Sequence, residues 1–481
     1  MLKNKIISIA VSFFCLSAAA QDSLSYRVDA FASFSSEDLT PFWITNNTYG
    51  VVPLQSNNIY GRGVVKWDHQ FNRNFKLQTG LDLVGADKHS SDYFIQQLYT
   101  SLSYKSLNLS IGAKEYYNSI LDKNLSTGDF NYSPNARPIP EINLSMPEFT
   151  TVPYTKKILQ IRGDFAVGKS TDNTYIENNK RPEKNYTIDI LWHHKSLYFK
   201  LSDPKSQFPF SAIFGFEHAV QWGGWTTVDG KGDLPRSFSD FARVVVGKEG
   251  GSNASLGEQI NVLGNQQGTY NLKLSYHRPA FTLSAYKQHY FDDNSGIEYV
   301  NWRDGVWGIE SEFHAQNYIK KILLEYFNST NQSGPMHFLN HDRPNTRGGG
   351  NDDYYNHETY ISGWSHWGRT LGNPLITSPE YYQDIYFQNN RVKAIHLGLN
   401  GDFSSAVSYR VLLTGMYAWG RMSYPFLERK NNFSSLIECS YAPSCWKDWK
   451  LTLQAAFDNG SLYNDNFGCS LKISKSGTIG N

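Results

Sequence analysis

Apolar and polar side chains alternate over four successive stretches near the end of the chain. The stretches cover residues 395–400, 409–419, 449–458 and 466–473. A β-strand points successive side chains to opposite faces, so each stretch predicts a strand with one apolar and one polar face. Strands of about ten residues with aromatic residues near their ends are typical of a sheet that crosses a bilayer, whereas soluble strands usually have about five or six.

The same alternation recurs through most of the preceding chain. It predicts strands over residues 24–34, 59–71, 74–86, 94–104, 107–116, 157–168, 186–191, 197–202, 208–220, 270–277, 281–291, 305–314 and 320–327. Short turn-forming segments between many of these stretches predict antiparallel hairpins. The predicted fold class is therefore all-β, a transmembrane outer-membrane antiparallel β-barrel of about 16 to 18 strands. Barrels of this size enclose water unless loops fill them.

Two long segments interrupt the strand pattern. Residues 117–154 form a proline-rich connection, and residues 328–390 show almost no periodicity. Loops of this length are uncommon in compact domains, and they usually carry function or fill a space. We therefore expect both segments to contribute to the function or to occlude the barrel.

A third interruption, residues 237–263, carries helical signals. Ser237 can cap a helix that ends at Gly247, and Ser255 with Glu258 forms a capping box ahead of a second apolar segment. These two short helices cannot belong to the wall of a barrel. We expect them in the lumen or at one mouth.

The composition agrees with a barrel and excludes a bundle of membrane helices. Aromatic residues make up 15% of the 481 residues, and the mean hydropathy of −0.48 suits a watery interior with aromatic girdles. Residues 1–20 predict a secretory signal, with Lys3 and Lys5 ahead of an apolar run and a small-residue cleavage site. One closed sheet can take up the mature chain, so residues 21–481 are expected to form a single barrel in the cell outer membrane.

Charge and cysteine content exclude several kinds of partner. Without the two lysines of the predicted signal, the 45 basic residues fall to 43 against 44 acidic ones, which gives no support for nucleic-acid binding. Three cysteines remain, Cys439, Cys445 and Cys469, and they match neither a disulfide framework nor a zinc site. Cys439 and Cys445 could still bridge a turn, and Cys469 is expected to be a small buried apolar residue. We predict no cofactor.

The clearest candidate chemistry is a mixture of aromatic, amide, carboxylate and arginine side chains outside the strands. A sugar presents an apolar C–H face and a rim of hydroxyl groups, and a flat aromatic ring beside Asp, Asn or Arg matches both surfaces. Alternatively, such aromatic residues belong to the interface girdle or fill the barrel mouth. The candidate polysaccharide-binding residues are Trp222, Trp225, Trp302, Arg303, Asp304, Tyr355, His357, Glu358, Trp364, His366, Trp367 and Arg369.

The sequence argues against an enzyme. Glu217 and His218 are neighbours on a predicted strand, so they point to opposite faces and cannot act as a hydrogen-bonded pair. The chain has no nucleophile elbow, phosphate loop or dinucleotide fingerprint. No spacing typical of metal ligands relates His193, His194, His357 and His366, so we predict no metal site.

Five blocks of the chain resemble a known family. They are residues 40–43, 191–199, 215–224, 240–251 and 355–364. Through these blocks the mature chain resembles the capsule assembly proteins called Wzi, in the branch found in Bacteroidetes. The resemblance implies an outer-membrane barrel of about 18 strands, occluded by a helical bundle at the periplasmic end and by extracellular loops. It also implies a lectin that holds capsular polysaccharide at the cell surface without catalysis.

Two other functions stay open at the level of the sequence. A diffusion porin would have an open lumen that conducts ions, and an outer-membrane hydrolase would need a base and a nucleophile in one loop cluster. The predicted partners are capsular polysaccharide, outer-membrane lipids and the outer-membrane assembly machinery, with no nucleic acid. The barrel is expected to be a monomer.

Overall fold

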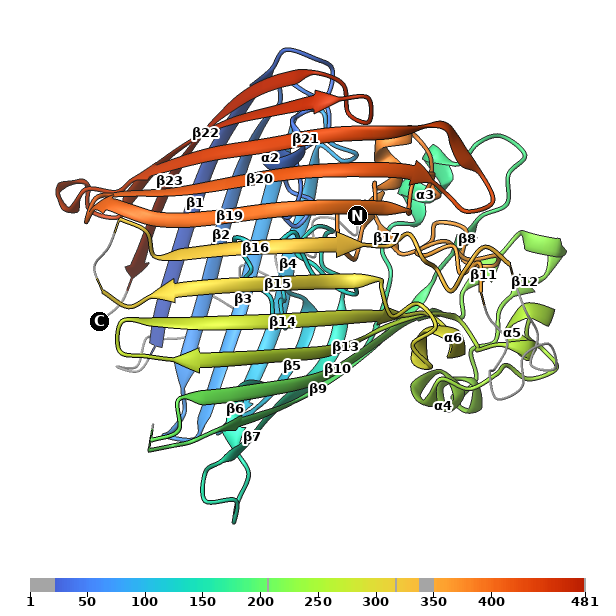
Figure 1. The fold of residues 1–481 in the computed structure, drawn as a ribbon, viewed down its shortest axis with the longest axis horizontal. Helices are drawn as coiled ribbons and strands as arrows, with labels where there is room; N and C mark the ends of the chain where they lie inside the picture. The colour runs from blue at the N-terminus through green and yellow to red at the C-terminus, as the bar shows by residue number, and fades with distance from the viewer. Residues whose placement is uncertain (1–21, 206, 316–317, 337–349, 480–481) are drawn as a thin grey trace, which may run out of the picture.

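The barrel wall is one closed antiparallel sheet. A computed structural model of the chain describes residues 22–205, 207–315, 318–336 and 350–479, so the predicted signal peptide lies outside the described residues. The described residues form a sheet of 18 strands, in which each strand pairs with the next barrel strand along the chain (Figure 1). The first strand also pairs with the last, which closes the ring and confirms the predicted all-β barrel.

The barrel strands are long, as the alternation predicts. In chain order they are β1 (Asp22–Ser35), β2 (Ile59–Gln70), β3 (Phe75–Ala86), β4 (Tyr93–Tyr104), β5 (Leu107–Ala113), β6 (Glu141–Thr151), β7 (Leu159–Lys169), β9 (Leu191–Ser202), β10 (Phe210–Trp222), β13 (Asn265–His277), β14 (Phe281–Phe291), β15 (Gly305–Phe313), β16 (Lys321–Asn328), β19 (Val392–Ser404), β20 (Val407–Gly420), β21 (Pro425–Tyr441), β22 (Trp449–Gly460) and β23 (Asn466–Ile479).

Two of these strands differ from the sequence prediction. β6 lies inside the expected connection 117–154, where Pro147 and its proline-rich surroundings hide a strand. β21 contains the charged run 428–430 near its start, which breaks the alternation. In addition, the separate strands predicted over 186–191 and 197–202 are the single strand β9, preceded by the two-residue β8 (Thr187–Ile188).

Side chains alternate between the two faces of the wall. In β22, Leu453 and Phe457 point outward and are exposed, whereas Thr452 and Asp458 point inward and are buried. The period of two confirms the predicted strand geometry. The outer face is consequently a belt of apolar side chains.

The three cysteines are free and exposed. The prediction that Cys469 is buried is wrong, because this residue lies on the outward face of β23, and that face is the apolar one. The bridge considered between Cys439 and Cys445 is not formed.

The two ends of the barrel differ in the length of their connections. The first and last strands pair Leu24 with Ile479, so both described ends of the chain lie at one end of the barrel, together with short turns such as 105–106 and 278–280. The opposite end, at the right of Figure 1, carries the long connections, which contain the α-helices. We call these the short-turn end and the long-connection end.

The helices and minor strands are all short. They are α2 (Phe42–Thr45), α3 (Asn173–Asn179), β11 (Trp225–Thr226), η2 (Val228–Gly230), β12 (Gly232–Asp233), α4 (Phe238–Val246), α5 (Leu256–Ile260), α6 (Asn294–Ile297), β17 (Ser365–His366), β18 (Arg369–Thr370), η3 (Pro379–Tyr382) and η4 (Ser444–Trp446). Within the described part of the chain, no helix combines the length and the apolar character needed to cross a membrane. The capping boxes at Ser237 and Ser255 begin α4 and α5.

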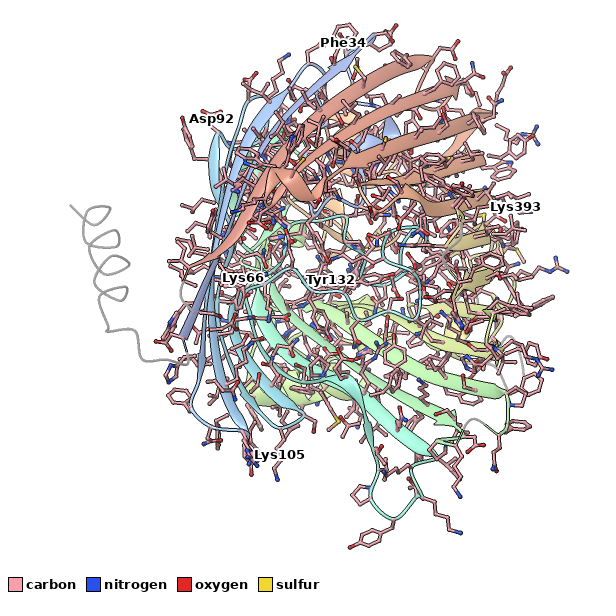
Figure 2. The ribbon with its side chains drawn as sticks, turned by 90° about the vertical axis from the view of Figure 1, so that its left-hand side faces the viewer. Phe34, Lys66, Asp92, Lys105, Tyr132 and Lys393 are labelled. Atoms are coloured by element: carbon pink, nitrogen blue, oxygen red, sulfur yellow. The ribbon has the colours of Figure 1, made fainter. Side chains whose placement is uncertain are left out.

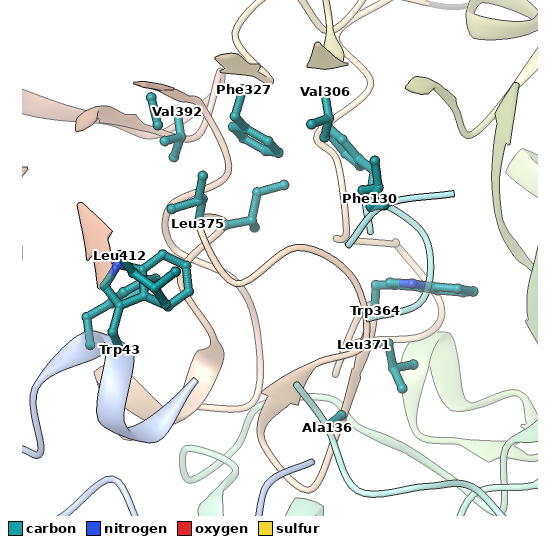
Figure 3. Close-up of a cluster of buried hydrophobic side chains, with 14 of the residues drawn as sticks. Trp43, Phe130, Ala136, Val306, Phe327, Trp364, Leu371, Leu375, Val392 and Leu412 are labelled. Atoms are coloured by element: carbon teal, nitrogen blue, oxygen red, sulfur yellow. The ribbon is translucent and has the colours of Figure 1, made fainter. Parts of the chain in front are cut away.

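Three long connections fold back into the barrel and fill it. We call residues 36–58, 114–140 and 350–391 the plug. Figure 2, viewed into the short-turn end, shows the segment around Tyr132 inside the ring of strands. The plug and the inner wall share one cluster of buried apolar side chains, shown in Figure 3, which includes Trp43, Phe130, Ala136, Val306, Phe327, Trp364, Leu371, Leu375, Val392 and Leu412. Each fully buried Leu or Phe of this kind stabilises the fold by about 1.5–3 kcal/mol.

Polar side chains of the inner wall hold the plug in register. The carboxylate of Glu325 on β16 accepts hydrogen bonds from Ser126 Oγ (2.6 Å) and the Thr127 backbone N–H (2.7 Å). Asp458 on β22 accepts one from the Phe42 N–H (2.8 Å). The polar inner face of these strands thus bonds to the plug.

The helix α4 lies on the outer side of the wall near the long-connection end. The ring of Phe241 packs 5.4 Å from that of Trp222 and 5.6 Å from that of His193. His193 and Lys195 share the outward face of β9 with exposed Leu197, and the Lys195 ammonium donates to the carbonyl of Val245 in α4. The helix therefore covers polar outward positions of the wall at the rim of one mouth.

Candidate functional site

An open cavity of about 930 Å³ lies at the long-connection end. Its walls come from segments far apart in the sequence, including α5 with the start of β13, the residues after β14, the last plug connection and the turn between β20 and β21. Carboxylates, amides and arginines dominate the lining, and two tyrosines and a phenylalanine add aromatic surface. This mixture suits a ligand with many hydroxyl groups.

Each tyrosine that lines the cavity is paired with an arginine held by an aspartate. The guanidinium of Arg181 lies 5.5 Å from the ring centroid of Tyr386, and its Nη2 lies 2.7 Å from Asp384 Oδ2. Asp384 is buried, so it fixes the arginine. We call Tyr386, Arg181 and Asp384 the first tyrosine unit.

The second tyrosine unit repeats this arrangement with Tyr424, Arg421 and Asp353. The guanidinium of Arg421 lies 5.1 Å from the Tyr424 centroid, and its Nε lies 3.1 Å from both carboxylate oxygens of Asp353. Tyr424 is 70% exposed, so its ring is available to a ligand. Fixed arginines beside accessible rings offer both stacking surface and hydrogen-bond donors.

Three aspartates form an acidic cluster in the same cavity. One carboxylate oxygen from each of Asp292, Asp293 and Asp352 lies within 4.8 Å of the others. Burial, followed by the charge of Asp352, raises the pKa of Asp292 well above its usual range. Burial and the charge of Asp293 raise the pKa of Asp352 to about 7. A cluster of carboxylate oxygens is the donor set that a hard cation prefers.

Of the twelve predicted site residues, His357 and Glu358 line this cavity. Burial lowers the pKa of His357, although the carboxylates of Glu258 and Glu358 act in the opposite direction. Its Nδ1 accepts a hydrogen bond from the Thr359 N–H at 3.0 Å, which suits a neutral imidazole. Glu358 is exposed. These two predicted residues therefore lie in the candidate cavity.

Four other predicted residues are buried in the plug. The Trp364 Nε1–H donates to the carbonyl of Asn131 at 2.7 Å, and Arg369 Nη2 donates to Thr45 Oγ1 at 2.8 Å. Both interactions join different plug connections. Tyr355 and His366 bond in the same way to backbone carbonyls of the connection 114–140. Their burial argues against the predicted contact with a ligand, because none of the four presents a surface to the cavity.

The next predicted residues lie around the outer rim. Trp222 is buried beneath Phe241 of α4, and Trp225 lies in the small sheet formed by β8, β11 and β12. The carbonyl of Trp302 accepts a hydrogen bond from Lys287, whose ammonium also lies over the outward ring of Trp307. Trp302 is exposed beside an outward-facing strand position, which is where the alternative interpretation expects a girdle residue.

The remaining three predicted residues also lie outside the cavity. Asp304 is buried and accepts hydrogen bonds from the backbone of Asn331 and Gln332, so it shapes a connection. Arg303 is exposed next to it. Trp367 is half-buried, with the guanidinium of Arg137 4.4 Å from a ring centroid.

Sequence reasoning missed the two tyrosine units. Tyr386 and Tyr424 lie in different connections, and Arg181 and Asp353 come from further segments that lie far from their tyrosines in the sequence. No spacing rule links such residues. The one clue in the sequence is the number of predicted strands between these residues, because counting antiparallel strands places their connections at the same end of the barrel.

A second cavity of about 760 Å³ lies below the plug at the short-turn end. Charged inner-wall residues such as Arg62, Glu438 and Lys472 line it, and plug residues Val51 and Val52 close it on one side. No residue lines both cavities in the described part of the chain. The plug therefore separates them.

Comparisons with known proteins place the chain in context. The family model described as capsule assembly protein Wzi matches residues 44–459. The solved structure of Wzi, an outer-membrane protein of Escherichia coli described as a carbohydrate-binding β-barrel involved in group 1 capsule assembly, aligns with a TM-score of 0.58. Its identity to this chain is 14%, over 98% of this chain and 87% of that one.

A second solved structure, OccAB2 of Acinetobacter baumannii, aligns with a TM-score of 0.51 and 10% identity, over 96% of this chain and 100% of that one. Identities this low show a shared barrel fold and nothing more. No curated protein shows significant similarity to the chain.

Proposed function

The chain belongs to the family of the capsule assembly protein Wzi, and on this premise we propose that it binds capsular or exopolysaccharide at the cell surface. In this proposal the barrel sits in the outer membrane, with its apolar belt against lipid. The cavity at the long-connection end holds a segment of the glycan. The protein retains polysaccharide and catalyses no reaction.

The observation that carries the proposal is the pair of tyrosine units in the open cavity. Tyr386 and Tyr424 supply rings for the C–H faces of sugars, and Arg181 and Arg421 supply donors at fixed positions. Because Asp384 and Asp353 hold the arginines in place, little side-chain freedom is lost when a ligand binds.

The orientation follows from the connections. Outer-membrane barrels have short periplasmic turns and longer extracellular loops. We therefore propose that the cavity faces the outside of the cell, as retention of capsule requires. The same rule puts α4 and α5 on the extracellular side, in place of the periplasmic helical bundle that the resemblance implies.

The plug inside the lumen favours this function over a diffusion porin. The plug fills the barrel with a continuous apolar cluster and is bonded to the wall through Glu325 and Asp458. We expect little ion conductance in planar bilayers. A porin would need a continuous aqueous path through this cluster.

Catalysis has no support at the neighbouring acid–base pair Glu217 and His218. Glu217 accepts a hydrogen bond from Thr269 Oγ1 inside the barrel, whereas His218 bonds to Gln266 beneath the α4–α5 segment outside the wall. The two side chains lie on opposite faces of β10. They cannot exchange a proton with one substrate.

The test is binding of the producing strain's own polysaccharide to the purified barrel in detergent. The double variant Tyr386→Ala, Tyr424→Ala should bind at least about tenfold more weakly, because two stacking contacts are worth about 1–3 kcal/mol together. The matched control is Tyr154→Ala, which removes a fully exposed tyrosine from a turn at the opposite end of the barrel. Equal binding by the double variant and the parent would refute the assignment of the site. Equal binding of unrelated polysaccharides would refute the lectin role.

A further inference from the structure

The acidic cluster brings together carboxylates from two separate segments. Asp292 and Asp293 follow β14 directly, and Asp352 belongs to the last plug connection. One oxygen from each lies within 4.8 Å of the others. Carboxylate oxygens that converge in this way are the donor set that a hard cation prefers.

Two oxygens of the cluster lack a protein partner. Asp352 Oδ1 accepts hydrogen bonds from the Gly350 N–H (3.0 Å) and Ser295 Oγ (3.4 Å). Its second oxygen, and Oδ1 of Asp292, are inaccessible to solvent and accept no hydrogen bond. Buried carboxylate oxygens are normally hydrogen-bonded or bound to a cation.

A third unpartnered acceptor, from a neutral side chain, points to the same place. Gln267 is 1% exposed and its Oε1 has no hydrogen-bond partner. The amide is oriented by a chain of bonds, since Asn265 Nδ2 donates to Gln221 Oε1 (2.8 Å) and Gln267 Nε2 donates to Asn265 Oδ1 (3.0 Å). The amide nitrogen of Gln267 is therefore hydrogen-bonded, and its oxygen is an acceptor without a donor.

The strand register turns the Gln267 side chain to the inner face of the wall, where the cavity with the cluster lies. Gly268 pairs with Phe291, and Phe291 packs on the outer face against Phe216. The pairing ends at this position, and Asp292 follows in a bend. Continued by one residue, the alternation of the two strands points both Gln267 and Asp292 inward. Both line the same cavity as Asp352.

We propose that Asp292, Asp352 and Gln267 bind a calcium ion at the base of the cavity, with Asp293 adding negative charge beside it. Carboxylate and amide oxygens are the ligands that calcium prefers, and its flexible coordination tolerates donors from three separate segments. The absence of sulfur or imidazole donors within the described cluster disfavours zinc and copper.

The ion would also change what the cavity can bind, a consequence that rests on the proposed function. The described lining residues include the carboxylates Glu258, Asp292, Asp293, Asp352, Asp353, Glu358 and Asp384, against the cations Arg181, Lys184 and Arg421. This excess of negative charge repels a glycan that carries uronate or phosphate groups. Calcium reduces the excess and offers open coordination positions to such groups or to sugar hydroxyls.

The test is calcium binding by the purified full chain in detergent after removal of divalent ions with a chelator. Calorimetric titration with calcium alone should show one ion per chain and a rise in the thermal midpoint of unfolding. Asp352→Asn should weaken binding at least tenfold. The control Glu358→Gln changes an exposed carboxylate of the same cavity outside the cluster and should bind as the parent does.

Two further measurements keep the outcome decisive. Gln267→Leu removes the amide oxygen without altering any charge, so it replaces Asp352→Asn if that variant fails to give the heat-resistant barrel band on a gel. No binding by the parent at about 10 mM calcium, which is well above the range of extracellular calcium modules, would overturn the proposal. Unchanged binding by the Gln267 or Asp352 variants would overturn it equally. Polysaccharide binding in chelator is measured separately, so a failure of the calcium site is distinguishable from a failure of the lectin role.

Discussion

Trp364 separates two explanations of the aromatic residues in the last plug connection. The sequence alone predicts a sugar-stacking ring at this position. In the structure the indole is fully buried, its Nε1–H donates to the Asn131 carbonyl at 2.7 Å, and its ring centroid lies 5.3 Å from that of Trp192 on the wall. The change Trp364→Ala therefore tests whether this residue stabilises the plug or contacts a ligand.

The expected cost follows from those contacts. Removing a buried tryptophan costs about 3–5 kcal/mol, and leaving the Asn131 carbonyl without its donor adds about 1–3 kcal/mol. A loss of about 4 kcal/mol in the local stability of the plug corresponds to roughly a thousandfold faster exchange of its protected amides. The matched control Trp302→Ala removes an exposed indole on the outer rim and should cost less than about 1 kcal/mol.

Hydrogen–deuterium exchange followed by mass spectrometry measures this directly. Peptides from 114–140 and 350–391 should exchange faster in Trp364→Ala, whereas peptides from strands far from the plug core should not change. Polysaccharide binding should fall only as far as the opened plug disturbs the cavity. If exchange is unaffected and binding alone is lost, the structural explanation is refuted and Trp364 contacts the ligand.

Three further outcomes follow from the structure. Glu325→Gln should raise conductance in planar bilayers, because it weakens hydrogen bonds to a charged acceptor worth about 1.5–3 kcal/mol each; parent-like conductance would mean that the plug does not depend on them. The pKa of Asp352 is raised from 3.8 to about 7, so in chelator the stability that its bound proton contributes should be complete below about pH 4 and lost as the pH rises through about 7. The midpoint of thermal unfolding should fall over that range, and Asp352→Asn should flatten the profile. Phe241→Ala should release α4 from the wall at a cost of about 2 kcal/mol, which limited proteolysis between α4 and α5 would detect as faster cleavage.

The wall of the barrel is predictable from the sequence because its signal is local. Within residues 449–458 the polarity of each side chain indicates the face of the strand on which it lies, and β22 follows that pattern. β6 and β21 escaped prediction because Pro147 and the charged run 428–430 mask the same period. The alternation of apolar and polar side chains therefore predicts the strands reliably, but it is weak in the sequences of these two strands.

The plug and the site are harder to predict because their contacts are not local. Nothing in the neighbourhood of Trp364 reveals that Asn131 will accept its hydrogen bond, and a polar residue such as Glu325 on an inward face is equally compatible with water. His357 and Glu358 were among the predicted residues because they lie in a connection rich in polar and aromatic residues. Tyr386 and Tyr424 were not, because the fold alone brings them into one cavity.

The pairing of the first strand with the last has a consequence for biosynthesis. Residues 22–35 bond on one flank to β2 and on the other to the final described stretch of the polypeptide. While that stretch is missing, β1 and β22 each present a bare edge, and bare edges recruit strands from other molecules. Secreted nascent chains therefore need shielding until translation has finished. A truncation that removes even one terminal strand should cause the product to aggregate, because the sheet can then no longer close into a ring.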